Sequence, residues 1–360
     1  GRRPFDLEHA QPFRLVLIEG DVAQLLMLVG HDIAFDKWSL GIFWREWSRA
    51  YTGSAEPSSD RTLQYGDFAH YQSLQTGEAS NVQLDYWRKQ LVGLPAPSRF
   101  VIAGTGGDAA GALEVAGISP EIAARVRQLA QKSGVSVSSL ALAAFQILCS
   151  RYADSDDVTV GMPVANRQLP ETADMIGFFL GTVALRSRIG AKQTVASFLK
   201  GVHATVGKAM LHQDVPFDRV VEAMNPPRVP GQHPIFQSML VYQRESEAVP
   251  LTTVEDLRFE LAYVDIGVSK FDLTLFVAER GDAMELVAEY RSDRLQRGAI
   301  QRLLGHYREI LRSMAEAPEA ELAQVNWIPA TEQSQLCEAW TGLDPGDVPP
   351  TVLDAIWGRA

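Results

Sequence analysis

The chain has 360 residues, of which 46% are hydrophobic and 21% are charged, an ordinary globular composition. Its formal net charge is −11 and its isoelectric point is near 5.2, which argues against nucleic acid and anionic membranes as partners because both are negatively charged. We therefore expect a soluble cytoplasmic protein that forms one large domain or two subdomains.

The two cysteines, Cys149 and Cys337, have no metal-ligand spacing, and Cys149 directly follows an apolar run over 140–148, which predicts a buried thiol. The sequence shows no disulfide framework, no signal peptide and no apolar run long enough to cross a bilayer. We also find no metal-ligand cluster, phosphate-binding loop or nucleophilic serine elbow. The chain opens with GRRPFDL and without an initiator methionine, so we expect it to be a piece of a longer protein.

Alternating apolar and polar residues over 13–30, with a Glu-Gly-Asp turn between them, predict two strands, the second of which ends at His31. Helical spacing of apolar residues predicts a helix over 38–51, and the stretch 65–91 is also expected to be helical. Residues 54–61 form a polar loop. The segment 93–111 is rich in Pro, Gly and Ala and is the expected subdomain boundary.

Strands and helices alternate again after this boundary. Ser119 and Pro120 are a cap and a first-turn proline, which predict the start of a helix. The further expected elements are a very apolar helix after 135–139 that runs through 148, strands over 158–164 and 182–188, a helix over 195–212, strands near 237–242, 271–278 and 285–290, and a last helix over 297–314. Because strands and helices alternate in both halves, the fold class is α/β.

Seven short motifs occur along the chain, at 30–39 (GHDIAFDKWS), 65–72 (YGDFAHYQ), 161–167 (GMPVANR), 176–182 (IGFFLGT), 212–218 (HQDVPFD), 233–237 (HPIFQ) and 270–273 (KFDL). Together, and in this order, they resemble the signatures of condensation domains of nonribosomal peptide synthetases. The first resembles the HHxxxDG motif of that family. Gly181 stands where the family usually has Asn.

The resemblance implies a fold similar to chloramphenicol acetyltransferase, with two subdomains in a V and a central tunnel. Carrier proteins of such synthetases dock at opposite ends of the tunnel and insert phosphopantetheine arms. We expect residues 1–95 to be a partial N-terminal subdomain that lacks the family's first portion. Residues 96–330 would then be the C-terminal subdomain, and 331–360 a linker to the next synthetase domain.

The histidine motif departs from the family at two positions. In active members the second histidine is catalytic and positions or deprotonates the acceptor amine, but here this residue is Asp32. Aspartate ordinarily titrates about two to three pH units below histidine, so it is a weaker proton acceptor. Lys37 replaces the glycine of the motif and would crowd a place where the family needs backbone room. A Lys37–Asp32 ion pair would fill the tunnel further.

The rest of the motif keeps its family identity. The resemblance implies that Asp36 and Arg167 form a structural ion pair and that His31 is structural. The other motif residues have structural explanations: 212–217 as a helix end and turn, His233 as a hydrogen-bonded strand-start residue, and 178–179 as core and hinge packing. Three tryptophans of the helix over 38–51 are expected in the core, namely Trp38, Trp44 and Trp47.

Two functions from different classes fit the altered motif. One is a catalytically inactive docking module of antibiotic or other secondary-metabolite biosynthesis, similar to the X domain of glycopeptide-antibiotic synthetases, which recruits Oxy-type haem monooxygenases to the carrier-bound peptide. The other is an active condensation domain that forms peptide bonds by positioning two carrier-bound thioesters. An engineered or damaged active copy is a third possibility. A heterocyclisation domain fits less well, because that group has Asp where this chain has His31.

Overall fold

The computed structural model describes residues 3–20, 24–54, 63–74, 78–95, 110–244, 253–254, 257–258 and 267–341. Three sequence expectations lie largely outside these residues: the loop 54–61, the subdomain boundary within 93–111, and the part of the linker beyond 341. The proposed division into 1–95, 96–330 and 331–360 therefore stays a prediction.

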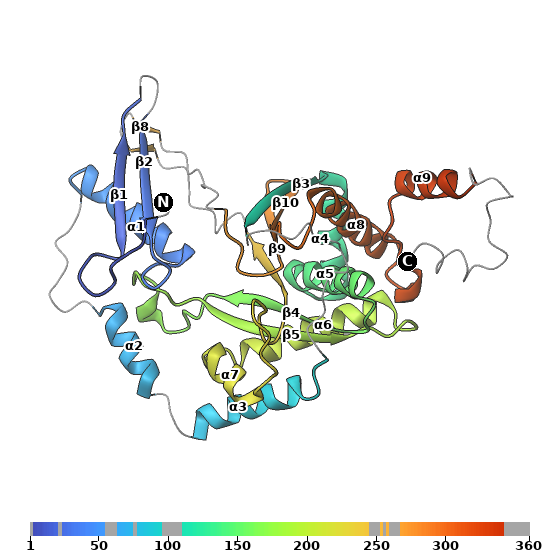
Figure 1. Ribbon diagram of the computed structural model, residues 1–360, viewed down its shortest axis with the longest axis horizontal. Coiled ribbons are helices and arrows are strands. Elements are labelled where there is room, and N and C mark those ends of the chain that lie inside the picture. Colours follow the sequence, from blue (N-terminus) through green and yellow to red (C-terminus); the bar gives the residue numbers. More distant parts are fainter. Residues whose placement is uncertain are drawn as a thin grey trace.

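Strands and helices alternate along the chain as the sequence indicates (Figure 1). The strands are β1 Phe13–Ile18, β2 Leu25–Gly30, β3 Gly111–Ile118, β4 Asp157–Val164, β5 Gly181–Arg188, β6 Ser238–Gln243, β7 Thr253–Val254, β8 Leu257–Arg258, β9 Leu273–Arg280 and β10 Ala283–Arg291. The helices are α1 Lys37–Tyr51, α2 Tyr65–Leu74, α3 Glu78–Leu91, α4 Pro120–Ser133, α5 Val137–Ala153, α6 Val195–Met210, α7 Phe217–Met224, α8 Arg297–Glu316 and α9 Ala330–Thr341, with short 3-10 turns at Pro170–Thr172 and Leu322–Gln324.

A six-stranded mixed sheet organises the larger part of the molecule, in the order β3-β10-β9-β6-β4-β5. The strand β6 runs parallel to both of its neighbours, β9 and β4, whereas the other neighbouring pairs are antiparallel. Helices α4, α5, α6 and α8 pack against its strands. This arrangement confirms the α/β class expected from the sequence.

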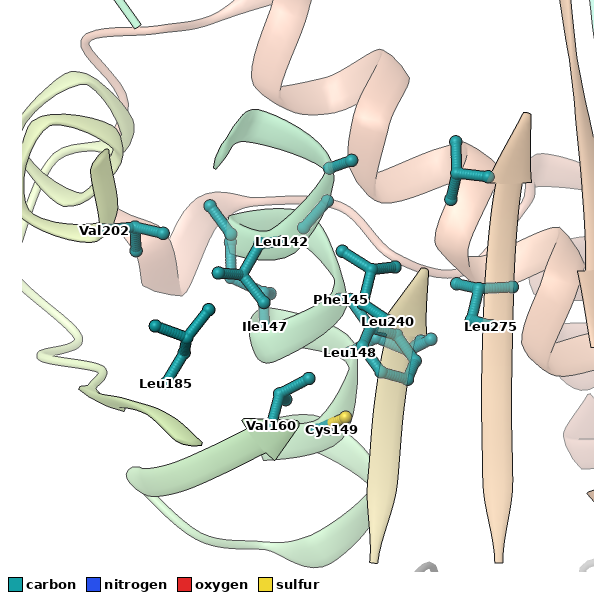
Figure 2. Close-up of a cluster of buried hydrophobic side chains, with 14 of the residues drawn as sticks. Leu142, Phe145, Ile147, Leu148, Cys149, Val160, Leu185, Val202, Leu240 and Leu275 are labelled. Atoms are coloured by element: carbon teal, nitrogen blue, oxygen red, sulfur yellow. The ribbon is translucent and has the colours of Figure 1, made fainter. Parts of the chain in front are cut away.

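Helix α5 forms the centre of the core. Its residues 139–150 are all buried, as expected for a helix that is apolar on every side. Figure 2 shows side chains of this helix, among them Phe145 and Leu148, gathered with Leu240 and Leu275 of the sheet. The buried amide of Gln146 is satisfied, because its Nε2 donates to the carbonyl of Leu185 at 2.9 Å.

Cys149 lies in this core, as predicted, and burial raises the pKa of its thiol well above the ordinary value. Among the described helices, no single one is long and apolar enough to cross a membrane. Only the pair α4 and α5 meets that criterion by length and composition when taken together, and the two helices are bent by 107° at their junction.

The hairpin β1–β2 lies at one end of the molecule and α9 at the other (Figure 1). The register of the hairpin pairs Phe13 with Gly30 and Ile18 with Leu25. Its second strand ends directly before His31, as the sequence predicted, and α1 begins after Asp36. The hairpin therefore delivers the histidine motif to the loop between β2 and α1.

Arg186 of β5 fastens α3 to the large sheet. Its guanidinium donates to the carbonyls of Val92 at 2.7 Å and Gly93 at 3.1 Å, just after the end of α3. It also pairs with Asp157 of β4, and its side chain is only 6% exposed. A buried cation at a helix C-terminus satisfies carbonyl groups that the helix leaves free.

Four details differ from the sequence expectations. The stretch 65–91 holds two helices, α2 and α3, rather than one. Strand β3 and helix α7 were not foreseen. Trp38 is 51% exposed and not in the core, because its indole lies at the surface and donates from Nε1 to the carbonyl of Ala173 at 2.9 Å. Trp44 and Trp47 are half-buried.

Candidate functional site

The loop that carries the histidine motif is a tight turn. The backbone N–H of Ala34 donates to the carbonyl of His31 at 2.9 Å, and the N–H of Ile33 donates to its Nδ1 at 3.1 Å. The imidazole of His31 packs edge-on against Phe5, with ring centroids 5.8 Å apart. These contacts give His31 a structural place in the turn.

Asp36 ends the turn and caps α1. Its carboxylate accepts from the N–H of Ser39 at 2.8 Å and from the N–H of Phe179 at 3.1 Å. It also pairs with the Nη2 of Arg167 at 3.1 Å, and both side chains are only 3% exposed. The structure thus brings Asp36 and Arg167 together, in the buried ion pair that the family resemblance implies.

Arg167 reaches the motif from the loop that follows β4. Its Nη1 donates to the carbonyls of Thr172 and Met175, the latter at 2.8 Å, and its guanidinium stacks on the ring of Phe179 at 4.0 Å from the centroid. Burial lowers the pKa of Arg167 and the charge of Asp36 raises it. Arginine stays charged under such shifts, so the pair is ionic.

Ser39 and Tyr65 complete this anchor and were not singled out from the sequence, although both lie inside quoted motifs. The hydroxyl of Ser39 contacts the carbonyl of Gly177 at 2.8 Å and accepts from its N–H at 3.0 Å. The hydroxyl of Tyr65 donates to the carbonyl of Phe178 at 2.8 Å. A Cβ on Gly177 would lie 2.2 Å from the ring of Tyr65, which explains why the motif has glycine there.

Asp32, at the position of the catalytic histidine, forms an ion pair with Lys270. Lys270 lies just before β9, so the pair joins the motif loop to the large sheet. The two side chains are 63% and 70% exposed, respectively, and an ion pair this exposed to solvent is weak. The sequence had suggested Lys37 as the partner of Asp32.

Lys37 is the first residue of α1, and it is exposed. Its side chain therefore lies at the surface of the motif region rather than inside the packed anchor around Asp36. The motif tolerates lysine at the glycine position because this residue begins the helix in an ordinary helical conformation, which does not require the left-handed backbone that favours glycine.

A pocket of about 170 Å³ is lined in part by Asn166 and Gln168, the two neighbours of Arg167 in the chain. It is lined by Phe68 and Tyr71 of α2, Gln83 of α3, Asn166 of the loop, and Asp214 of the segment before α7, with further residues of the same segments. Phe68 packs on Phe179 with ring centroids 4.6 Å apart, so the pocket and the motif anchor share a wall.

The two remaining histidine motifs have structural roles. His212 stacks on Tyr86 at 4.0 Å, and its carbonyl accepts from the Nε1 of Trp87 at 2.9 Å, which fixes α3. The ring of His233 lies against Phe217 and Phe236, and burial lowers its pKa to about 4. Among the described residues, no group of His, Cys, Asp or Glu is placed to hold a metal ion.

Comparisons with known proteins agree with the motifs. The profile of the condensation domain matches residues 1–337. Bacitracin synthase 3 of Bacillus licheniformis is 33% identical over 352 residues, and tyrocidine synthase 2 of Brevibacillus parabrevis is 30% identical over 346 residues. These alignments cover 93% and 94% of this chain but only 5% and 10% of the two synthases. The chain therefore spans about a tenth or less of either relative.

Solved structures with this fold match most of the chain. The X-domain from teicoplanin biosynthesis superposes with a TM-score of 0.82 at 23% identity, and the alignment covers 91% of this chain and 77% of that one. The complex of the X-domain and OxyB from the same biosynthesis gives 0.79 at 22% identity, covering 91% of this chain and 75% of that one. These similarities confirm the expected fold, which resembles chloramphenicol acetyltransferase.

Three findings support one assignment. They are a profile match over nearly the whole chain, synthase relatives at 30% identity or more, and a shared fold. The chain belongs to the condensation-domain family, as a member in which aspartate replaces the second histidine of the motif.

Proposed function

We propose that this domain does not form peptide bonds and instead holds a tailoring enzyme, of the haem monooxygenase type, close to a carrier-bound peptide. The observation that carries the proposal is the ion pair between Asp32 and Lys270, at the position where an active member has its catalytic histidine. We further propose that the domain acts in the cytoplasm as part of an antibiotic or other secondary-metabolite synthetase.

The chemistry of the pair supports inactivity. The acceptor amine must lose a proton as it attacks the donor thioester, so the site needs a group that titrates near neutrality. A carboxylate beside an ammonium group already has a cationic partner, and it would hold an incoming ammonium ion in its charged, non-nucleophilic form. The intact anchor of Asp36 and Arg167 fits a domain that keeps its fold while it loses its base.

The fold similarity supports the choice of partner. One of the similar solved structures is a complex of an X-domain with OxyB, in which a domain of this fold is bound to a second protein. Tethering an oxygenase next to the peptide raises its effective concentration without any chemistry by the tether. The carrier protein would bring the peptide on a phosphopantetheine arm, which therefore arrives with the substrate.

A condensation assay tests the loss of activity. Donor and acceptor carrier proteins loaded with aminoacyl thioesters are mixed with the domain, and dipeptide is measured by mass spectrometry. We expect none from the unmodified domain and measurable product from the variant with Asp32→His and Lys37→Gly. Asp174→Asn, which alters a surface pair with Arg45, is the matched control and should form no product. Turnover by the unmodified domain would overturn the proposal.

A binding experiment tests recruitment separately. Calorimetric titration with the haem monooxygenases encoded beside the synthetase should give saturable binding by the unmodified domain. The variant with Asp32→His and Lys37→Gly should bind equally well, because docking does not use the motif. Absence of binding to all of these oxygenases would count against recruitment even if the domain proves inactive.

A second function is favoured by one observation. Relatives at 30–33% identity are synthases, among them those of bacitracin and tyrocidine, and this chain retains the anchor that places the motif. Positioning of two bound thioesters accounts for much of the rate in such reactions, so a domain without the second histidine can retain some activity. Under this alternative the unmodified domain forms dipeptide, and Asp32→Ala lowers the rate.

A further inference from the structure

The pocket beside the motif anchor has a chemical character of its own. Its walls come from α2, α3, the loop at 166–169 and the segment 214–216, four parts of the chain that meet only in the folded protein. Its volume of about 170 Å³ corresponds to several water molecules. It is therefore large enough for the end of one flexible side chain and too small for a peptide.

The polar groups of the pocket favour a positive charge. Asp214 provides a carboxylate, and the described residues that line the pocket include no lysine, arginine or histidine. Gln83 donates from Nε2 to the Oδ2 of Asp214 at 3.0 Å, which fixes the orientation of its amide. Within the described part of the chain, the Oε1 of Gln83 is buried and accepts no hydrogen bond. Such an unused buried acceptor is unfavourable until a donor reaches it.

Two aromatic rings complete the arrangement. Phe68 and Tyr71 lie on the same side of α2, with ring centroids 6.5 Å apart. Tyr71 is 46% exposed, so its ring can be reached from solvent. An aromatic face beside a carboxylate and an amide oxygen is a favourable environment for an ammonium ion, since each of the three attracts positive charge.

We infer that this pocket binds a primary ammonium group on a short aliphatic stem, held by Asp214, the Oε1 of Gln83 and the ring of Tyr71. Such a group is carried either by a lysine side chain of a protein that docks on this face or by a free small amine. The inference does not depend on whether the domain forms peptide bonds.

The position of the pocket connects it to the motif. Asn166 lines the pocket and adopts a left-handed backbone conformation, with φ of +49°. The next residue, Arg167, does not line the pocket and pairs with Asp36. A ligand that contacts Asn166 therefore touches the same short loop that holds the histidine motif in place.

Ligand-observed NMR titrations at neutral pH test the inference. The probes are butylammonium, its uncharged isostere 1-butanol, and Nα-acetyl-lysine amide. We expect both amines to bind and butanol to bind about tenfold more weakly or worse, as the loss of a charge-assisted hydrogen bond implies. Equal binding of butanol and butylammonium would overturn the inference. Tighter binding of the lysine amide identifies a protein side chain as the ligand, and tighter binding of butylammonium identifies a free amine.

Variants locate the binding. Asp214→Asn keeps the shape of the pocket and removes its charge, so it should weaken butylammonium binding about tenfold. Tyr71→Leu keeps apolar volume and removes the aromatic face, and it should weaken binding severalfold. Asp218→Asn is the matched control, because Asp218 is a carboxylate of α7 that does not line the pocket. A loss that is the same for Asp214→Asn and Asp218→Asn, or no loss for Asp214→Asn in a folded variant, contradicts the inference.

Discussion

The carboxylate of Asp36 caps a helix, neutralises a buried arginine and accepts from the backbone of a distant segment at the same time. Each of these partners is buried with it. Because the pair is buried, water cannot replace the carboxylate of Asp36 as the partner of Arg167. Loss of this carboxylate therefore leaves Arg167 as an uncompensated buried charge.

Asp36→Asn is therefore expected to lower the free energy of unfolding by about 3–5 kcal/mol. Asp174→Asn is the matched control, because Asp174 pairs with Arg45 at the surface with 78% of its side chain exposed. An exposed pair contributes about 0–1 kcal/mol. Urea denaturation followed by circular dichroism measures both changes, and equal midpoints for the two variants would contradict the structural role of Asp36.

A second residue-scale prediction concerns His233. Burial lowers the pKa of His233 in the folded protein to about 4, against an ordinary value of 6.5. Between these values the unfolded chain binds more protons than the folded one, so the stability contributed by this group falls as the pH is lowered through that range. Below about pH 4 the folded form also protonates and the dependence ends.

His233→Phe keeps the stacking on Phe217 and removes the titration, so the fall in stability between pH 6.5 and about 4 should become shallower. His9→Gln is the control, since His9 is exposed and its removal should leave the profile unchanged. Thermal unfolding across this pH range measures the slopes. An unaltered slope for His233→Phe would show that other groups govern acid stability.

At the scale of elements, one buried arginine holds the C-terminal end of α3. Arg186 satisfies carbonyls at the end of this helix and pairs with Asp157, whereas Arg188 contacts the same carboxylate with 77% of its side chain exposed. The two arginines share a partner and differ in burial. Substituting each in turn therefore distinguishes the effect of the buried contact with α3 from the effect of an exposed charge.

Arg186→Met is expected to lower the free energy of unfolding by about 1–3 kcal/mol, because the carbonyls at the end of α3 lose their hydrogen-bond donor. Amide hydrogen exchange in 78–91 should become faster in this variant. Arg188→Met should change the free energy of unfolding by about 1 kcal/mol or less and should leave the exchange of the α3 amides nearly unchanged. Unchanged protection of α3 in Arg186→Met would contradict the anchor.

The elements also show where sequence reasoning works. The central strands and α5 were predictable, because buried strands are rich in valine and leucine and α5 is apolar throughout. Strand β3 was missed since its sequence, GALEVAGI, begins with glycine and alanine after a linker-like stretch. The single helix predicted over 65–91 proved to be two, and helical spacing alone did not reveal the break.

Some parts of the candidate site could likewise be predicted from the sequence, and others could not. The pair of Asp36 and Arg167 could be predicted because both residues lie in motifs of the family. The pair of Asp32 and Lys270 could not, because Asp32 departs from the family motif and the resemblance therefore implies no partner for it. The pocket was also out of reach, because it exists only where α2, α3 and two loops converge. Such convergence depends on tertiary packing, which no local pattern records.

At the scale of the whole molecule, the six-stranded sheet and its helices form one continuous core, and the segment before β3 joins it through apolar side chains of α3 and a few polar and aromatic contacts. The main ones are Asp36 with Arg167, Tyr65 with Phe178, Arg186 with the end of α3, and the buried side chains of Trp87 and Leu91. The histidine motif is thus held by its attachment to the core rather than by packing within its own hairpin.

This attachment has a consequence for synthesis on the ribosome. The residue that caps α1, Asp36, pairs with Arg167, which follows it by 131 residues in the chain. At about 5–20 residues per second, translation takes about 7–26 seconds to add that length. During this interval Asp36 and the motif loop lack the buried partner that attaches them to the core. The segment that carries the histidine motif is therefore made well before the residues that stabilise it, and the nascent domain is most exposed to aggregation or to chaperones at this stage.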